Sequence, residues 1–190
     1  MTDDKYLISV VGPTAIGKTS LAIELAKEFE TEIISADSRQ FFKELTIGTA
    51  KPTAEEQSLV KHHFIDNLSI REEYNASSFE KEALEFLKSY FEDHQMIVLC
   101  GGSGMYINAL LNGFDEDLPS ADEVIRKELR DRLAEEGIES LQAELKVLDP
   151  EFYKKIDLNN SKRLMRAIEI CRISGMPYST LRKGKRKQRD

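Results

Sequence analysis

The 190-residue sequence predicts an α/β fold: a phosphate-loop core of three layers around a parallel sheet, followed by an all-helical insertion. Two passages support the core, at residues 7–29 and 96–111. In each, a short apolar run, typical of a buried parallel strand, leads through a glycine turn into a helical pattern. No strand pattern occurs between residues 119 and 181, which supports the insertion. We expect three parts: the core at 1–113, the insertion at 114–181 and a basic tail at 182–190.

The elements of the core follow from their apolar patterns. Buried strands are expected at residues 7–11, 32–35 and 96–100, and a further short strand at 63–66. Apolar residues at helical spacing predict helices over 20–29, from Ser77 or Ser78 to Phe91, and over 105–111. Thr53 is a good N-cap for a short helix that begins at Ala54.

In the insertion, helix boundary signals divide the chain. Residues 120–123 have the form of a capping box, which would open a helix that Gly137 ends. Further helices are expected over 139–148, directly after Asp149-Pro150, and over 162–174 with Asn160 or Ser161 as its cap.

A complete phosphate-binding motif lies between the first strand and the first helix. It fits the pattern G-x-x-x-x-G-K-[ST] with the residues Gly12, Pro13, Thr14, Ala15, Ile16, Gly17, Lys18 and Thr19. Backbone N–H groups in such a loop surround a phosphate, and the helix start adds free donors. Lys18 can reach the phosphate oxygens, and the Thr19 hydroxyl can ligate Mg²⁺. The motif therefore predicts a polyphosphate site with Mg²⁺ as its cofactor.

Carboxyl ends of parallel strands meet at one edge of a sheet, so residues after the second and fourth strands are expected beside this loop. Asp37 is the carboxylate placed there, as a general base or a ligand of metal-bound water. Ser103 is expected at the same edge. The neighbouring residues His62 and His63 point to opposite faces of a strand, so packing or a local hydrogen bond is expected of them and not a metal site.

Composition and charge indicate the kind of partner and the cellular compartment. The formal net charge is −7, yet six of the last nine residues are cations: Arg182, Lys183, Lys185, Arg186, Lys187 and Arg189. A basic tail on an acidic protein indicates a polyanionic partner. No apolar run approaches the roughly 20 residues of a membrane span, and the first residues lack a signal core. Cys100 and Cys171 are expected to be free thiols in a reducing compartment. We expect a cytoplasmic monomer.

The residues alone leave two classes of function open. One is a kinase that binds ATP in the loop and uses Asp37 to activate a hydroxyl group of a small metabolite or nucleotide. The other is a transferase that holds a diphosphate leaving group in the loop. A nucleotide-dependent switch is disfavoured, because the sequence lacks a guanine-reading Asn-Lys-x-Asp motif.

Several motifs in order resemble the tRNA dimethylallyltransferases. Besides the loop they are Ile33-Ile34-Ser35-Ala36-Asp37-Ser38-x-Gln40, Ile47-Gly48-Thr49-Ala50-Lys51-Pro52, His62-His63-x-Ile65-Asp66, Gly101-Gly102-Ser103-Gly104-Met105-Tyr106 and Arg163-x-x-Arg166-Ala167-x-Glu169. The resemblance implies transfer of a dimethylallyl group from dimethylallyl diphosphate to N6 of the adenosine just 3′ of a tRNA anticodon. The loop would hold the diphosphate, and the helical insertion would bind the anticodon stem-loop.

The resemblance also implies roles for individual residues. Asp37 would be the general base, and Lys18 and Thr19, with Mg²⁺, would stabilise the leaving diphosphate. The expected tRNA contacts are Asp37, Ser38, Arg39, Gln40, Ser103, Asn160, Lys162, Arg163 and Arg166, together with the basic tail. Family members are longer than this chain, so the resemblance implies a truncated form that lacks the C-terminal part of the core.

Overall fold

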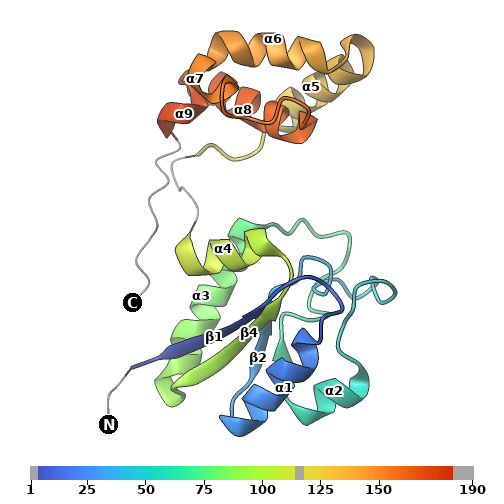
Figure 1. Ribbon diagram of the computed structural model, residues 1–190, viewed down its shortest axis with the longest axis vertical. Helices are drawn as coiled ribbons and strands as arrows, with labels where there is room; N and C mark the ends of the chain where they lie inside the picture. The colour runs from blue at the N-terminus through green and yellow to red at the C-terminus, as the bar shows by residue number, and fades with distance from the viewer. Residues whose placement is uncertain (1–3, 114–117, 182–190) are drawn as a thin grey trace. The chain divides into compact units, whose positions relative to one another are not determined.

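The structure, a computed structural model, describes residues 4–113 and 118–181. These residues form two compact units, which divide near residue 114. The first unit contains every strand of the described residues, and the second consists of helices (Figure 1). No helix in the described ranges combines the length and apolar character needed to cross a bilayer.

The first unit is built on a parallel sheet of four strands in the order β1-β4-β2-β3. The strands are β1 (Tyr6–Val11), β2 (Ile33–Ser35), β3 (His62–His63) and β4 (Met96–Gly101). β4 lies between β1 and β2, with Val10 opposite Cys100 and Ser35 also opposite Cys100. The segments that follow β1, β2 and β4 therefore leave the sheet at the same edge.

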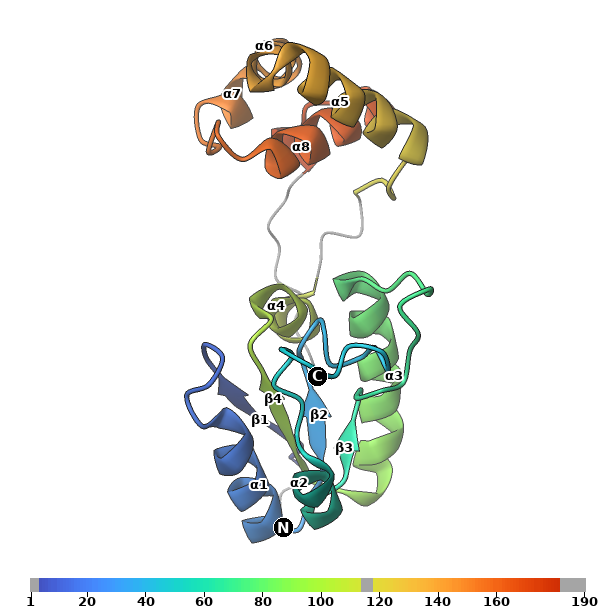
Figure 2. The same ribbon diagram turned by 90° about the vertical axis from the view of Figure 1, so that its right-hand side faces the viewer.

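Helices cover both faces of this sheet, which confirms the predicted α/β fold. Figure 2 shows α1 (Lys18–Glu28) and α3 (Ala76–Asp93) on opposite sides. α2 (Ala54–Leu59) follows the loop after β2, and α4 (Gly104–Asn112) follows β4 and packs against α3.

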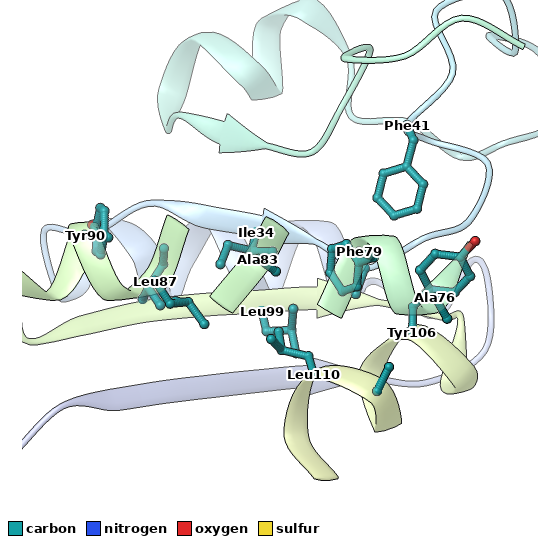
Figure 3. Packing of buried hydrophobic residues seen from close by; sticks show 13 residues of the cluster. Ile34, Phe41, Ala76, Phe79, Ala83, Leu87, Tyr90, Leu99, Tyr106 and Leu110 are labelled. Atoms are coloured by element: carbon teal, nitrogen blue, oxygen red, sulfur yellow. The ribbon is translucent and has the colours of Figure 1, made fainter. Parts of the chain in front are cut away.

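Alternation along the strands gives each face its own core. Ile33 and Val98 pack with α1, whereas Ile34, Ile97 and Leu99 pack with α3 and α4. Figure 3 shows the second cluster, in which Phe79 and the other side chains of α3 cover the sheet. Full burial of each large side chain contributes roughly 1.5–3 kcal/mol.

The second unit packs around its own apolar core. Its helices are α5 (Glu123–Glu136), α6 (Ile138–Leu148), α7 (Pro150–Tyr153), α8 (Ser161–Ser174) and α9 (Tyr178–Leu181). The fully buried side chains come from α5, α6 and α8 and include Leu129, Leu141, Leu145, Leu164 and Ile168.

Three local predictions are wrong. The cap of α3 is Asn75, whose Oδ1 accepts the amides of Ser77 and Ser78 at 2.9 and 3.1 Å. α5 has no capping box, because Asp122 accepts the amides of its first turn while Glu123 forms ion pairs along the helix. β3 spans only His62–His63, because pairing with β2 ends there. The predicted caps Thr53 and Asn160 are confirmed.

Candidate functional site

The phosphate-loop motif connects β1 to α1 as predicted. α1 begins at Lys18, its N-cap Gly17 makes no side-chain capping bond, and its first turn carries no acidic residue. Free amides and the positive end of the helix dipole are therefore available to an anion. The Lys18 ammonium is folded over the loop and donates to the carbonyl oxygen of Pro13 at 2.5 Å.

Gly101, the last residue of β4, and Gly102, which follows it, allow the loop and the segment after β2 to approach closely. A Cβ on Gly101 would lie 2.2 Å from the carbonyl oxygen of Ala36, so only glycine fits there. A Cβ on Gly102 would lie 3.8 Å from Lys18 Nζ and 4.0 Å from Asp37 Oδ2. The predicted ammonium and carboxylate therefore lie close to the same glycine.

Asp37 follows β2 at this edge. The amide of Ala36 donates to the carbonyl oxygen of Cys100 at 2.8 Å, which continues the sheet as far as the carboxylate. Asp37 Oδ1 accepts the Arg39 amide at 3.0 Å, and Oδ2 has no hydrogen-bond donor among the described residues. One carboxylate oxygen thus orients the side chain and the other remains available.

A single pocket joins these groups. The phosphate loop and Asp37 contribute polar groups, and Ile33, Cys100 and His62 also line the pocket. The full lining is Thr14, Ala15, Gly17, Lys18, Thr19, Ile33, Ser35, Asp37, Gln40, Ala50, Pro52, His62, Cys100, Gly101 and Gly102. Burial raises the pKa of the Cys100 thiol, and the nearby Asp37 adds to this while Lys18 acts against it. Burial lowers the pKa of His62. Both shifts favour the neutral form of the group.

Ser103 lies at the same edge, as predicted. Its Oγ accepts the Ser38 amide at 2.8 Å and lies 3.2 Å from Ser38 Oγ. Its own amide donates to the carbonyl oxygen of Ala36 at 3.2 Å. These bonds hold the segment after β2 against the segment after β4, so Ser103 fixes the position of the residues around Asp37.

The side chain of Gln40, a predicted RNA contact, bonds mainly within the protein. Its Oε1 accepts from Ser35 Oγ at 2.8 Å, and its Nε2 donates to the carbonyl oxygens of Thr49 and Ala50 at 3.2 and 2.9 Å. Gln40 therefore anchors the segment that contributes Ala50 and Pro52 to the pocket.

The sequence interpretation assigned no role to the ion pair of Lys51 and Asp66. The Lys51 side chain is only 6% exposed, and its ammonium donates to Asp66 and to the carbonyl oxygen of Phe42 at 2.6 Å. The sequence shows Lys51 beside Pro52 in a turn-rich segment, but no local pattern identifies Asp66, 15 residues later, as its partner.

The histidines behave as predicted. His62 Nδ1 lies 2.8 Å from the carbonyl oxygen of Val60, and His63 bonds to Glu32. The described residues hold no group of three or more His, Cys, Asp or Glu side chains that could bind a metal. The Thr19 hydroxyl and the Asp37 carboxylate both line the pocket. This oxygen donor set fits Mg²⁺, which commonly takes its other ligands from phosphates and water.

The predicted tRNA contacts of the helical unit separate into two kinds. Lys162 and Arg163 are exposed at the start of α8 and form no salt bridge within the described ranges. Asn160 Oδ1 accepts the Arg163 amide at 3.1 Å and caps the helix. Arg166 instead pairs with the buried Glu169 at 2.6 Å and donates to a backbone carbonyl at 2.7 Å. The predicted tail at 182–190 lies outside the described residues.

Comparisons with known proteins agree with one another. The model of a family described as IPP transferase matches residues 40–190. A tRNA dimethylallyltransferase of Christiangramia forsetii is 51% identical over 97% of this chain and 61% of its own length, and one of Cytophaga hutchinsonii is 50% identical over 98% and 61%. The crystal structure of the full-length tRNA isopentenylpyrophosphate transferase from Bacillus halodurans is 38% identical, with a TM-score of 0.58 over 92% of this chain and 58% of that one. The chain therefore spans about three fifths of the length of these relatives.

Proposed function

The chain belongs to the IPP transferase family, and from this membership we propose that the protein transfers a dimethylallyl group from dimethylallyl diphosphate to tRNA. The acceptor is N6 of the adenosine just 3′ of the anticodon. One observation carries the proposal for this chain: Lys18 and Asp37 lie close to the same glycine in one pocket, with the phosphate loop as its wall. The relatives named tRNA dimethylallyltransferases support the choice of substrates. A tRNA-modifying enzyme of this kind acts in the cytoplasm.

The phosphate loop binds the diphosphate of the donor. Its backbone amides and the start of α1 meet the phosphate oxygens, and Lys18 exchanges the Pro13 carbonyl for one of them. Negative charge develops on the diphosphate as the allylic C–O bond breaks. Donors fixed before the reaction stabilise this charge without reorganising, which makes the diphosphate a better leaving group.

Thr19 is the residue that would hold Mg²⁺ together with the diphosphate of the substrate. When bound, the ion supplies positive charge that neutralises the departing diphosphate. Thr19 would supply a single hydroxyl ligand, so the affinity of the ion would depend on the phosphates.

Asp37 acts as the general base. The adenine amine is a weak nucleophile, because its lone pair is delocalised into the ring. As N6 forms its bond to the allylic carbon, the C–O bond to the diphosphate breaks and one N6 proton passes to Asp37 Oδ2. General base catalysis of this kind contributes roughly 10²–10⁴-fold. Asp37 Oδ1 is held by the Arg39 amide, so the carboxylate is oriented before the substrate binds.

The adenosine reaches Asp37 only if it leaves the stack of the anticodon loop. Ser38 and Arg39 lie in sequence between the pocket residues Asp37 and Gln40 and would contact the nucleotide as it enters. Lys162 and Arg163 contact phosphates of the stem, because they are exposed cations without carboxylate partners among the described residues. Asn160 and Arg166 support this surface by fixing α8.

A single assay tests the proposal. The protein is incubated with tRNA and either dimethylallyl diphosphate labelled in the allyl group or ATP labelled in the γ-phosphate. We expect the allyl label on the tRNA and none from ATP. Label that moves from ATP to a hydroxyl acceptor, with no transfer from dimethylallyl diphosphate, would refute the proposal and favour a kinase.

A further inference from the structure

Ile47 is the most exposed large apolar side chain of the described residues. It is 99% exposed, whereas the next ones, Val124 and Val147, reach 80%. It occupies a turn with Gly48, whose φ of +75° suits glycine. Single apolar residues of intermediate exposure are common on surfaces, but an isoleucine held wholly in water gains nothing from the fold.

Hydrogen bonds hold the loop that carries Ile47. Thr49 Oγ1 donates to the carbonyl oxygens of Leu45 and Thr46 at 3.0 and 3.2 Å and closes the tip of the loop. The Gln40 amide holds the backbone at Thr49 and Ala50. Isoleucine is branched at Cβ and therefore stiff, so Ile47 is a rigid apolar projection on a fixed loop.

This projection lies beside the pocket. Ala50 and Pro52 line the pocket, and three peptide units separate Ala50 from Ile47. The Cα atoms of Ile47 and Ala50 are therefore at most about 11 Å apart. A nucleotide whose base enters the pocket keeps its sugar and its neighbouring bases within reach of Ile47.

We propose that Ile47 is a wedge that enters the RNA loop and occupies the space in the base stack from which the target adenosine is extruded. The inference rests on the proposed function. Extrusion breaks stacking on both sides of the base, and inserted apolar side chains offset this loss in proteins that unstack nucleic acids. A protein partner fits less well, because Thr46 and Gly48, the residues on either side of Ile47 in the sequence, add no large apolar side chain to it.

The test measures extrusion directly. A stem-loop RNA carries 2-aminopurine at the target position, where its fluorescence rises when the base unstacks. We expect the wild-type protein to produce this rise. Ile47→Ala should reduce it severalfold and lower kcat/KM for RNA about tenfold, by loss of the buried side chain. The KM for dimethylallyl diphosphate should not change. Ile47→Leu, which keeps the apolar volume, should behave as the wild type.

Ile70→Ala is the matched control, since it removes an isoleucine that is 56% exposed and does not line the pocket. A short single-stranded RNA, whose target base is already unstacked, should react with Ile47→Ala at the wild-type rate. Unchanged fluorescence and rate in Ile47→Ala, or an equal loss on both RNAs, would overturn the wedge. A wild-type protein that neither binds RNA nor transfers the allyl group would overturn the proposed function and this inference with it.

Discussion

Replacing Glu169 by alanine should destabilise the helical unit more than any surface substitution in it. The Glu169 side chain is 1% exposed and accepts hydrogen bonds from three groups: Arg126 at 2.9 Å, Arg166 at 2.6 Å and the Asp122 amide at 2.8 Å. These bonds connect α8 to the start of α5. Removing the carboxylate leaves two guanidinium groups and one amide without their acceptor.

The magnitude follows from the exposure of the partners. Removing one member of a buried ion pair costs about 3–5 kcal/mol when the other stays buried. Arg126 and Arg166 are 37% and 35% exposed, so water replaces part of what they lose. We therefore expect Glu169→Ala to lower the free energy of unfolding of this unit by about 2–4 kcal/mol.

The effect should depend on pH. Burial alone would raise the pKa of Glu169, but the hydrogen bonds from Arg166, the Asp122 amide and Arg126 outweigh it and lower the pKa. A carboxylate with a lowered folded-state pKa contributes its stability above the unfolded pKa of about 4.3 and loses it as the pH falls through the folded value. The difference between the wild type and Glu169→Ala should thus be constant near neutral pH and shrink in acid.

Amide hydrogen exchange read by mass spectrometry can localise the loss, which matters because the two units need not unfold together. Faster exchange should be confined to α5 and α8. Asp131→Ala is the control, since it breaks an exposed pair with Lys127 and should leave exchange unchanged. A loss below about 1 kcal/mol for Glu169→Ala, or one equal to the control, would refute the structural role of the ion cluster.

Three further outcomes are expected. Asp37→Asn should lower kcat about 10²–10⁴-fold while calorimetry finds unchanged affinity for dimethylallyl diphosphate; equal losses of both would exclude Asp37 as the base. Gly101→Ala should destabilise the core by at least about 2 kcal/mol in urea denaturation, since its Cβ would lie 2.2 Å from a backbone oxygen. Gly104→Ala, whose Cβ meets nothing within 4 Å, should be neutral. Replacing Lys162 and Arg163 by alanine should reduce the salt dependence of RNA binding by about one to two units of slope, and an unchanged slope would place the RNA elsewhere.

The fold was largely predictable because its signals are local. Apolar runs before glycine turns identified β1 and β4, and helical periodicity identified α1 and α3. Helix caps were predicted less well. Asn75 and Asp122 were missed because serines nearby fit the same local rules, and only the path of the chain decides which side chain faces the first amides.

The sequence predicted the positions of the site residues along the sheet edge but not the partners of their side chains. Lys18, Asp37 and Ser103 were placed correctly because each follows a strand of one parallel sheet. The ion pair of Arg166 could not be predicted, because exposed and ion-paired arginines give the same helical spacing. Its partner Glu169 lies three residues further on, and Arg126 joins the same carboxylate from another helix.

Gln40 shows how a motif can specify the shape of a site without supplying its chemistry. Its NH₂ group gives its hydrogens to two carbonyl oxygens of the following loop, and its Oε1 accepts from Ser35. An amide has two donors and two acceptor positions, so one lone pair of Oε1 remains for any substrate. The backbone carbonyl oxygen of Gln40 also accepts the Asp66 amide at 3.0 Å, and the Asp66 side chain pairs with Lys51. The motifs at residues 33–40, 47–52 and 62–66 are therefore held against one another, and together they position Ala50 and Pro52 in the pocket. Asp37 lines the same pocket, and its Oδ2, which has no donor among the described residues, is free to take a proton.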